Sequence, residues 1–256
     1  MTKPIQIKDL MIGDGIPKVC VPLTASTREC LCREAAAAKE AGADLVEWRA
    51  DFYEDLPQTE KTLETLNELS AILDRIPLLF TIRTKEEGGN VQITPEAYGN
   101  LNLAAASSGK ADLIDVEVFQ DAAEKAALIA AIQKTGAHVV GSSHDFEKTD
   151  DSETLLGRFK EIDAAGADIL KMAVMPEEFE DVAAIMQATS RMTREYTDKP
   201  VISMSMGSLG SISRIAGENF GSSVTFATVG AASAPGQFPI RELRMMMEAL
   251  HEKNCG

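Results

Sequence analysis

Short apolar runs of strand length recur along the chain at intervals of about thirty residues. Eight such runs begin near Lys18, Leu45, Leu78, Asp112, His138, Ile169, Val201 and Val224. Most are followed by a stretch with the length and period of a helix, as in residues 28–41 and 181–196. The interval between the last two runs is shorter, so the helix there is expected to be short.

A glycine stands where several of the helical stretches give way to the next strand. The glycines in these lead-ins are Gly42, Gly109, Gly136 and Gly166. Glycine can adopt the left-handed conformation that ends a helix. Strands that alternate with helices in this way imply parallel β-α units. Eight units predict a closed (β/α)₈ TIM barrel, and favour it over an open doubly wound sheet.

No Gly-x-Gly-x-x-Gly follows the first strand, which argues against a dinucleotide-binding sheet. No Pro- or Ser-rich linker interrupts the chain, so residues 1–256 are expected to form a single barrel domain. Ahead of the first unit, residues 5–12 resemble a short N-terminal hairpin around Gly13-Asp14-Gly15. In a barrel this hairpin could close the bottom.

The net charge of −15 makes nucleic acid and anionic membrane surfaces poor partners. Residues 1–10 lack the apolar core of a signal peptide, and no stretch of 18 apolar residues predicts a membrane span. The four cysteines form no C-x-x-C pair, which is typical of thiols in a reducing compartment. A cytoplasmic protein is therefore expected. Three histidines offer little material for a zinc site.

Charged residues gather at the carboxyl ends of the predicted strands, which form the active-site face of a barrel. In chain order they are Glu47, Arg49, Asp51, Arg83, Glu87, His144, Lys171 and Arg214, and the loop after the last strand adds Ser233 and Gln237. Arginine suits the bidentate grip of a carboxylate. The arginines suggest a small, anionic, hydroxylated ligand, although pairing with the neighbouring acids would also explain them.

Lys171 lies inside the apolar run Ile-Leu-Lys-Met-Ala-Val. If it pointed outward, its burial would carry a heavy desolvation cost with no obvious partner. If it points inward, desolvation and neighbouring cations are expected to lower its pKa and leave an amine that can attack a carbonyl. The alternative is a structural salt bridge to a strand-end acid such as Glu47.

His144 follows a strand whose first residue is His138. A histidine at the top of a strand can both take and give a proton, whereas the alternative is an ordinary loop histidine. Because His144 shares the rim with Lys171, the catalytic interpretation is favoured. His138, at the opposite end of the barrel, is expected to be structural.

Longer motifs resemble one family along nearly the whole chain. They are the sequences Glu-Trp-Arg-Ala-Asp at 47–51, Phe-Thr-Ile-Arg at 80–83 with Glu-Gly-Gly at 87–89, Ser-His-Asp-Phe at 143–146, Asp-Ile-Leu-Lys-Met-Ala at 168–173, Ser-Met-Gly at 205–207, Ser-Arg at 213–214, Ala-Gly-Glu at 216–218 and Ser-Ala-Pro-Gly-Gln at 233–237. The chain is similar to type I 3-dehydroquinate dehydratase of the shikimate pathway, which serves aromatic amino acid biosynthesis.

The resemblance implies a lyase that eliminates water from 3-dehydroquinate to give 3-dehydroshikimate. Lys171 would form a Schiff base with the ketone, His144 would be the general base and then the acid, and Glu87 would orient His144. Arg214 would bind the substrate carboxylate. The remaining predicted substrate-binding residues are Glu47, Arg49, Arg83, Met204, Ser233 and Gln237. The resemblance implies no metal or organic cofactor, and suggests a homodimer.

The match has departures and leaves alternatives. Pro22 stands where many members have serine, and Ser208 and Gly230 stand where some have lysine, which bears on substrate contacts. A class I aldolase acting on a small sugar-like substrate also uses a barrel lysine, and a catalytically dead barrel would have lost one of the key residues.

The small residues of 230–237 predict a loop that closes over bound ligand.

Overall fold

The barrel predicted by the repeating strands is present in the computed structural model, which describes residues 2–118, 122–230 and 235–254. Eight parallel strands form its wall: β3 (Lys18–Leu23), β4 (Leu45–Arg49), β5 (Leu78–Thr81), β6 (Leu113–Glu117), β7 (His138–Asp145), β8 (Ile169–Val174), β9 (Val201–Ser205) and β10 (Val224–Thr228). All eight begin at or next to the residues expected from the sequence. Between β9 and β10 the wall closes through Ser223, whose N–H donates to the carbonyl of Val201 at 2.7 Å.

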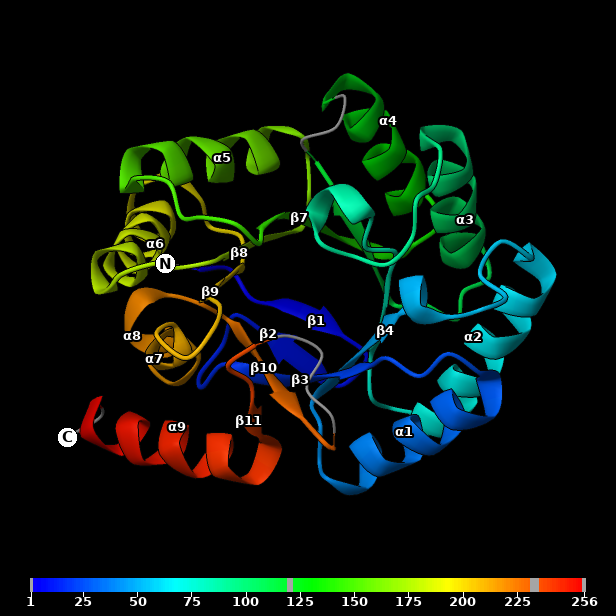
Figure 1. The fold of residues 1–256 in the computed structure, drawn as a ribbon, viewed down its shortest axis with the longest axis horizontal. Coiled ribbons are helices and arrows are strands. Elements are labelled where there is room, and N and C mark those ends of the chain that lie inside the picture. Colours follow the sequence, from blue (N-terminus) through cyan, green and yellow to red (C-terminus); the bar gives the residue numbers. More distant parts are fainter. Residues whose placement is uncertain (1, 119–121, 231–234, 255–256) are drawn as a thin grey trace.

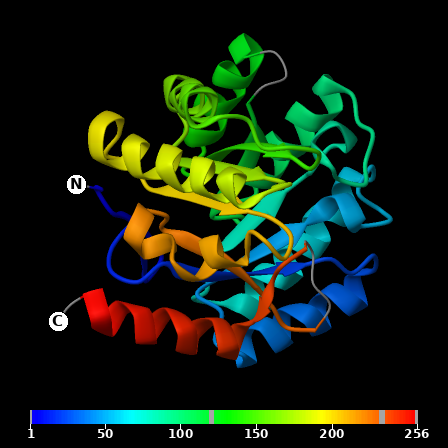
Figure 2. The same ribbon diagram turned by 60° about the vertical axis from the view of Figure 1, so that its left-hand side comes forward.

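A ring of helices surrounds the wall (Figure 1). They are α1 (Arg28–Glu40), α2 (Thr59–Leu73), α3 (Pro95–Ser107), α4 (Ala122–Gln133), α5 (Ser152–Ala164), α6 (Phe179–Arg191) and α9 (Ile240–Asn254). Between β9 and β10 the chain forms only α7 (Ser211–Ile215) and α8 (Gly217–Phe220), which confirms the expected short connection. Figures 1 and 2 both show α9 beside α1, so the last helix completes the ring next to the first.

The segments that precede the strands end one helix and also connect neighbouring strands. Gly42, Gly109, Gly136 and Gly166 all have positive φ, as expected for residues that end a helix. Three of these glycines are followed, two or three residues later, by an aspartate that directly precedes the next strand. The carboxylate of this aspartate binds the preceding strand. Asp44, Asp112 and Asp168 accept from the backbone N–H of Val19, Leu78 and Val139 at 2.7, 2.8 and 2.7 Å. Each carboxylate thereby helps to fix its strand to the neighbouring one.

A hairpin of β1 (Ile5–Ile7) and β2 (Leu10–Ile12) lies at the bottom of the barrel. The predicted position of its turn is wrong: Ile7 pairs with Leu10, so the chain turns at Lys8 and Asp9 and not around Gly13-Asp14-Gly15. Lys8 has a φ of 51°, which places a non-glycine residue in the left-handed region. The glycines follow β2 and lead the chain away from the hairpin.

The hairpin buries Ile7 and Ile12 against the lowest inward-facing side chains of the wall. These are Cys20, Leu45, Leu79, Leu113, Val140, Ile169, Ile202 and Val224, one from every strand of the barrel. The hairpin therefore seals the bottom, as the sequence suggested. A second and larger apolar core fills the space between the wall and the helices.

Ile12→Ala should lower the free energy of unfolding by about 2–5 kcal/mol, because Ile12 is fully buried in this seal and the truncation leaves a cavity. Its neighbour Met11 points away and is 37% exposed, so Met11→Ala should change stability by no more than about 0.5 kcal/mol. Urea denaturation of both variants checks the pair. Equal effects would contradict the role of Ile12.

Candidate functional site

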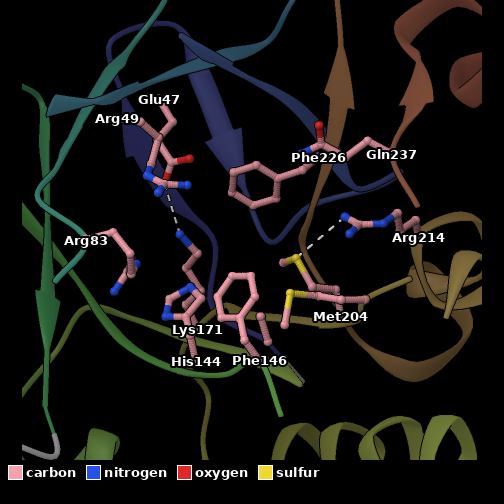
Figure 3. Close-up of a pocket in the computed structure, with 12 residues that line it drawn as sticks. Glu47, Arg49, Arg83, His144, Phe146, Lys171, Met204, Arg214, Phe226 and Gln237 are labelled. Atoms are coloured by element: carbon pink, nitrogen blue, oxygen red, sulfur yellow. Dashed lines mark hydrogen bonds and ion pairs between the residues drawn. The ribbon is translucent and has the colours of Figure 1, made fainter. Parts of the chain in front are cut away.

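A pocket opens at the carboxyl ends of the strands (Figure 3). Its described lining consists of Glu47, Arg49, Arg83, His144, Phe146, Lys171, Ala173, Met204, Met206, Arg214, Phe226 and Gln237. Most of the residues predicted from the sequence are therefore brought together here. Phe146, Met206 and Phe226 add apolar walls that the sequence analysis did not assign.

The side chains reach the pocket because residues along a strand alternate between its two faces. On β8, Ile169 belongs to the sealed bottom, so Lys171 and Ala173 are the next two inward positions above it. On β4 the same alternation starts from Leu45 and brings Glu47 and then Arg49 inward. The apolar bottom layer thus forms the floor beneath a charged upper layer.

Lys171 is buried, with its ammonium between two carboxylates. Its Nζ donates to Glu47 Oε1 at 3.0 Å and to Asp115 Oδ2 at 3.2 Å, and it lies 5.0 Å from the centre of the Phe226 ring. Burial alone lowers the pKa of Lys171, but Glu47 and Asp115 outweigh it, and the pKa is raised. The expected lowering is therefore wrong, because the prediction weighed neighbouring cations and not the carboxylate of Asp115.

From the sequence, a salt bridge between Lys171 and Glu47 and an inward position of Lys171 in the pocket were alternatives. In the structure both occur together. Glu47 Oε1 also accepts from the hydroxyl of Thr81 at 3.0 Å, so the carboxylate is held in place beside the amine. Either Glu47 or Asp115 can accept the proton that Lys171 must lose before it acts as a nucleophile. The geometry therefore provides a buried lysine with its own proton acceptors at the base of the pocket.

His144, near the end of β7 (His138–Asp145), is held by Glu87. Glu87 Oε2 lies 2.9 Å from His144 Nδ1 and accepts from the His144 backbone N–H at 3.0 Å. Burial lowers the pKa of His144, and the cations of Arg83, Lys171 and Arg49 lower it further. The ring is therefore neutral near pH 7 and can accept a proton. With Nδ1 bound to Glu87, Nε2 is left for a ligand in the pocket.

Glu87 has an unusual environment for a carboxyl group. Burial raises its pKa well above the ordinary range, and the charges of Glu117 and Asp115 raise it further, while Arg83 opposes them. Its position depends on Gly88, where φ is +77° and an added Cβ would lie 2.3 Å from the ring of Phe146. Only glycine fits there without displacing the turn that carries Glu87.

Arg83 is buried and hydrogen-bonded to the protein on several sides. Its Nη1 donates to Glu117 at 2.9 Å, Ser142 at 3.1 Å and Glu87 at 3.3 Å. Its Nη2 donates to Asp115 at 2.8 Å. The guanidinium thus holds three acids together at the edge of the pocket. Its predicted contact with substrate stays a prediction.

Arg49 is similarly engaged at the rim. Its Nε and Nη2 donate to the two oxygens of Asp51 at 2.7 and 2.8 Å, and the guanidinium lies 5.0 Å from the centre of the Phe52 ring. This bidentate pair fixes the plane of the guanidinium while it lines the pocket.

Arg214 differs from the other two arginines because it has no carboxylate partner among the described residues. It is 2% exposed, and its contacts are the sulfur of Met204 at 3.6 Å and the carbonyl of Pro235 at 3.1 Å. Desolvation lowers its pKa. Figure 3 places it across the pocket from Arg83, with Lys171 between. A buried cation without a counter-charge is an anion-binding group.

The loop after β10 (Val224–Thr228) is described only in part. Residues 231–234, which include Ser233 and make up half of the segment expected to close over ligand, lie outside the described residues, whereas Gln237 lines the pocket. Gly230 and Gly236, at the two ends of that segment, have φ values of +105° and +78°. Within residues 2–118, 122–230 and 235–254, no cluster of His, Cys, Asp or Glu could hold a metal ion.

Asp115 and Glu117 were missed from the sequence. Both are fully buried on β6 (Leu113–Glu117), and both bind Arg83. The signal was present: Leu113, Asp115 and Glu117 occupy alternate positions of one apolar strand, so they share its inward face. Acids at that spacing in such a strand indicate partners inside the barrel.

The described part of the chain contains no helix that is both long and apolar enough to span a bilayer.

Comparison with known proteins shows the family to which the chain belongs. Residues 19–254 match the family model of type I 3-dehydroquinase. A 3-dehydroquinate dehydratase of Listeria welshimeri is 42% identical over 97% of this chain and 98% of its own length. Another, from Klebsiella pneumoniae, is 41% identical over 98% of this chain and 100% of its own.

Solved structures agree with this match. The type I 3-dehydroquinate dehydratase of Clostridium difficile, crystallised with covalently modified comenic acid, superposes with a TM-score of 0.95 at 39% identity, and the match covers 99% of this chain and 100% of that one. The 3-dehydroquinate dehydratase of Geobacillus kaustophilus gives a TM-score of 0.94 at 38% identity, over 98% and 97% of the two chains. This chain therefore belongs to the type I 3-dehydroquinase family.

Proposed function

We propose that this chain is a hydro-lyase that converts 3-dehydroquinate to 3-dehydroshikimate through an imine on Lys171. The observation that carries the proposal is the placement of Lys171 between Glu47 and Asp115. The same pocket is lined by His144, which is bound to Glu87, and by Arg214, which has no carboxylate partner among the described residues. The pocket thus combines a nucleophile, a base and an anion-binding group. The family match supports the same activity.

The reaction begins with the amine. Once its proton has passed to Glu47 or Asp115, Lys171 Nζ attacks the ketone carbon, and the carbonyl oxygen leaves as water. The resulting imine, when protonated, draws electrons from the neighbouring carbon–hydrogen bond. It therefore takes the place of a metal or organic cofactor as electron sink.

His144 then transfers a proton from C2 of the substrate to the departing C1 hydroxyl. Its Nε2 removes the proton from C2, and the electron pair passes into the imine to give an enamine. The enamine expels the C1 hydroxyl, which leaves as water with the proton that His144 returns. Hydrolysis of the new imine releases 3-dehydroshikimate and restores the amine of Lys171.

Arg214 binds the substrate carboxylate in this proposal, because that group supplies the negatively charged partner that the guanidinium lacks among the described residues. The other residues proposed to contact the substrate are Glu47, Arg49, Arg83, Met204, Ser233 and Gln237. We also propose a homodimer, on the strength of the sequence resemblance, and a cytoplasmic location, on the strength of the cysteine pattern. Size-exclusion chromatography with light scattering measures the oligomeric state.

Addition of 3-dehydroquinate tests the activity, because formation of a conjugated enone raises ultraviolet absorbance. Borohydride added with substrate should reduce the imine and leave a fixed mass increase on the peptide that contains Lys171. No absorbance change, together with cleavage of a sugar phosphate and inhibition by inorganic phosphate, would instead support a class I aldolase. A label on another lysine would refute the mechanism and leave the overall reaction intact.

Arg214→Lys should raise KM for 3-dehydroquinate by about 10–100-fold, because a hydrogen bond to a charged group is worth about 1.5–3 kcal/mol and lysine lacks the bidentate fork. Steady-state kinetics at saturating and limiting substrate separate KM from kcat. Arg194→Lys is the matched control, since Arg194 is exposed on the helical surface. An unchanged KM in Arg214→Lys would remove Arg214 from carboxylate binding.

A further inference from the structure

Glu117 is the last residue of β6 (Leu113–Glu117), two positions beyond Asp115, and its side chain is fully buried. It lies outside the set of described residues that line the pocket. A carboxyl group in such a place carries a large desolvation cost unless its oxygens are bound by donors. Its partners therefore show what the residue is for.

Three donors converge on the Glu117 carboxylate. Oε1 accepts from Arg83 Nη1 and from the backbone N–H of Thr84, both at 2.9 Å, and Oε2 accepts from the Thr84 hydroxyl at 2.7 Å. The backbone of Glu117 is fixed as well, because its N–H donates to the buried hydroxyl of Tyr98 at 3.1 Å. The carboxylate is thus anchored at both oxygens and at its own main chain.

These contacts lead to the catalytic histidine in two ways. Thr84 directly precedes the turn Lys85–Glu87, so fixing its backbone fixes the start of the segment that carries Glu87. Arg83 Nη1, which donates to Glu117, also donates to Glu87 Oε2 at 3.3 Å. The same Glu87 oxygen accepts from the backbone N–H of His144 and lies within hydrogen-bond distance of its Nδ1.

On this basis we propose that Glu117 is a positioning residue for proton transfer: through Arg83 and Thr84 it determines where Glu87 holds His144. The inference rests on the proposed dehydratase function and names a residue of that site that never touches substrate. A misplacement of about 1 Å in a reacting group can cost roughly 100-fold in rate, so positioning through two residues is kinetically important.

The charge of Glu117 matters in addition to its shape. The groups that face Glu87 are Arg83 from the end of β5, Asp115 and Glu117 from β6, and His144 from β7. Glu117 and Asp115 raise the pKa of Glu87, whereas Arg83 lowers it. At neutral pH Glu87 therefore retains a proton, which it must lose before it orients the neutral ring of His144 as a carboxylate. Removing the charge of Glu117 lowers the pKa of Glu87.

Glu117→Gln tests the proposal, because it removes the charge and one acceptor while keeping the size. We expect kcat to fall by about 10–100-fold with KM changed by less than about threefold. Borohydride should still label Lys171. The rising limb of the kcat profile should move to lower pH, since the pKa of Glu87 falls. Glu117→Asp retains the charge, so its limb should stay at the wild-type pH even where kcat drops.

A role confined to stability predicts a different result. Asp112→Asn is the control, because Asp112 caps the start of β5 at the far end of the barrel. Asp112→Asn should lower the melting temperature and leave the rising limb of the kcat–pH profile at the wild-type pH. A Glu117→Gln enzyme with normal kcat and an unmoved limb overturns the proposal, and so does a rise in KM alone.

If Glu117→Gln does not fold, Thr84→Val removes a single donor to the same carboxylate and should lower kcat with KM unchanged. Normal kcat in that variant then overturns the proposal. The wild-type enzyme measured alongside separates the two inferences. An inactive wild type refutes the dehydratase function, whereas an active wild type with unaffected variants refutes only the role of Glu117.

Discussion

Replacing Lys171 with alanine is expected to lower turnover of 3-dehydroquinate by at least about 10⁴-fold, because loss of the nucleophile removes the covalent route altogether. His144 and Arg214 remain, so the variant should still bind substrate. The measurement is enone absorbance at saturating substrate, together with mass spectrometry after borohydride treatment. The wild-type protein should gain the reduced adduct, and Lys171→Ala should gain none.

Loss of the lysine also leaves Glu47 without its cation in a buried site, so the variant should be less stable. Circular dichroism at the assay temperature excludes unfolding as the cause of lost activity. Lys148→Ala is the control, because Lys148 is an exposed lysine that pairs with Asp150 at the surface. Turnover by Lys171→Ala within tenfold of the wild type would show that no imine at this position is required.

His144→Ala should lower kcat by about 10²–10⁴-fold, the usual contribution of general acid–base catalysis. Imine formation should survive because the amine and its acceptors Glu47 and Asp115 are untouched. The variant should therefore accumulate the adduct, and borohydride should trap it in good yield. The combination of slow turnover and efficient trapping separates proton transfer from substrate binding.

The same strand supplies the control for this experiment. His138 lies at the opposite end of β7 from His144, and its nearest acid, Asp168, is 3.9 Å away. His138→Ala should retain near-normal kcat. If it loses as much activity as His144→Ala, then truncation of any histidine on this strand damages the barrel, and the assignment of the base fails.

The wall of the barrel was predictable because its signal is local. Every strand is an apolar run, and a glycine with positive φ marks four of the entries, so each unit can be recognised within about thirty residues. The turn of the hairpin was not predictable in the same way. Its tip is Lys8-Asp9, a pair without glycine, and the inward contacts of Ile7 and Ile12 with the rest of the barrel fix its register.

Most of the polar residues that line the pocket were predictable from the sequence, but Asp115 and the electrostatic state of Lys171 were not. Alternation along a strand shows that Lys171 and Glu47 share the interior. It does not show that Asp115 from a third strand completes the pair around the ammonium. The direction of the pKa shift of Lys171 depends on that second carboxylate. The pKa is therefore raised, whereas the sequence predicted that it would be lowered.

The seal at the bottom of the barrel has a consequence for the order in which the chain can fold. The hairpin β1–β2 precedes the whole wall in the sequence, yet Ile7 and Ile12 belong to one apolar cluster with side chains from all eight strands. Its docking surface is incomplete until β10 has been synthesised and the wall has closed against β9. Contacts across so much intervening sequence form slowly. Residues made early during translation are thus among the last to be buried.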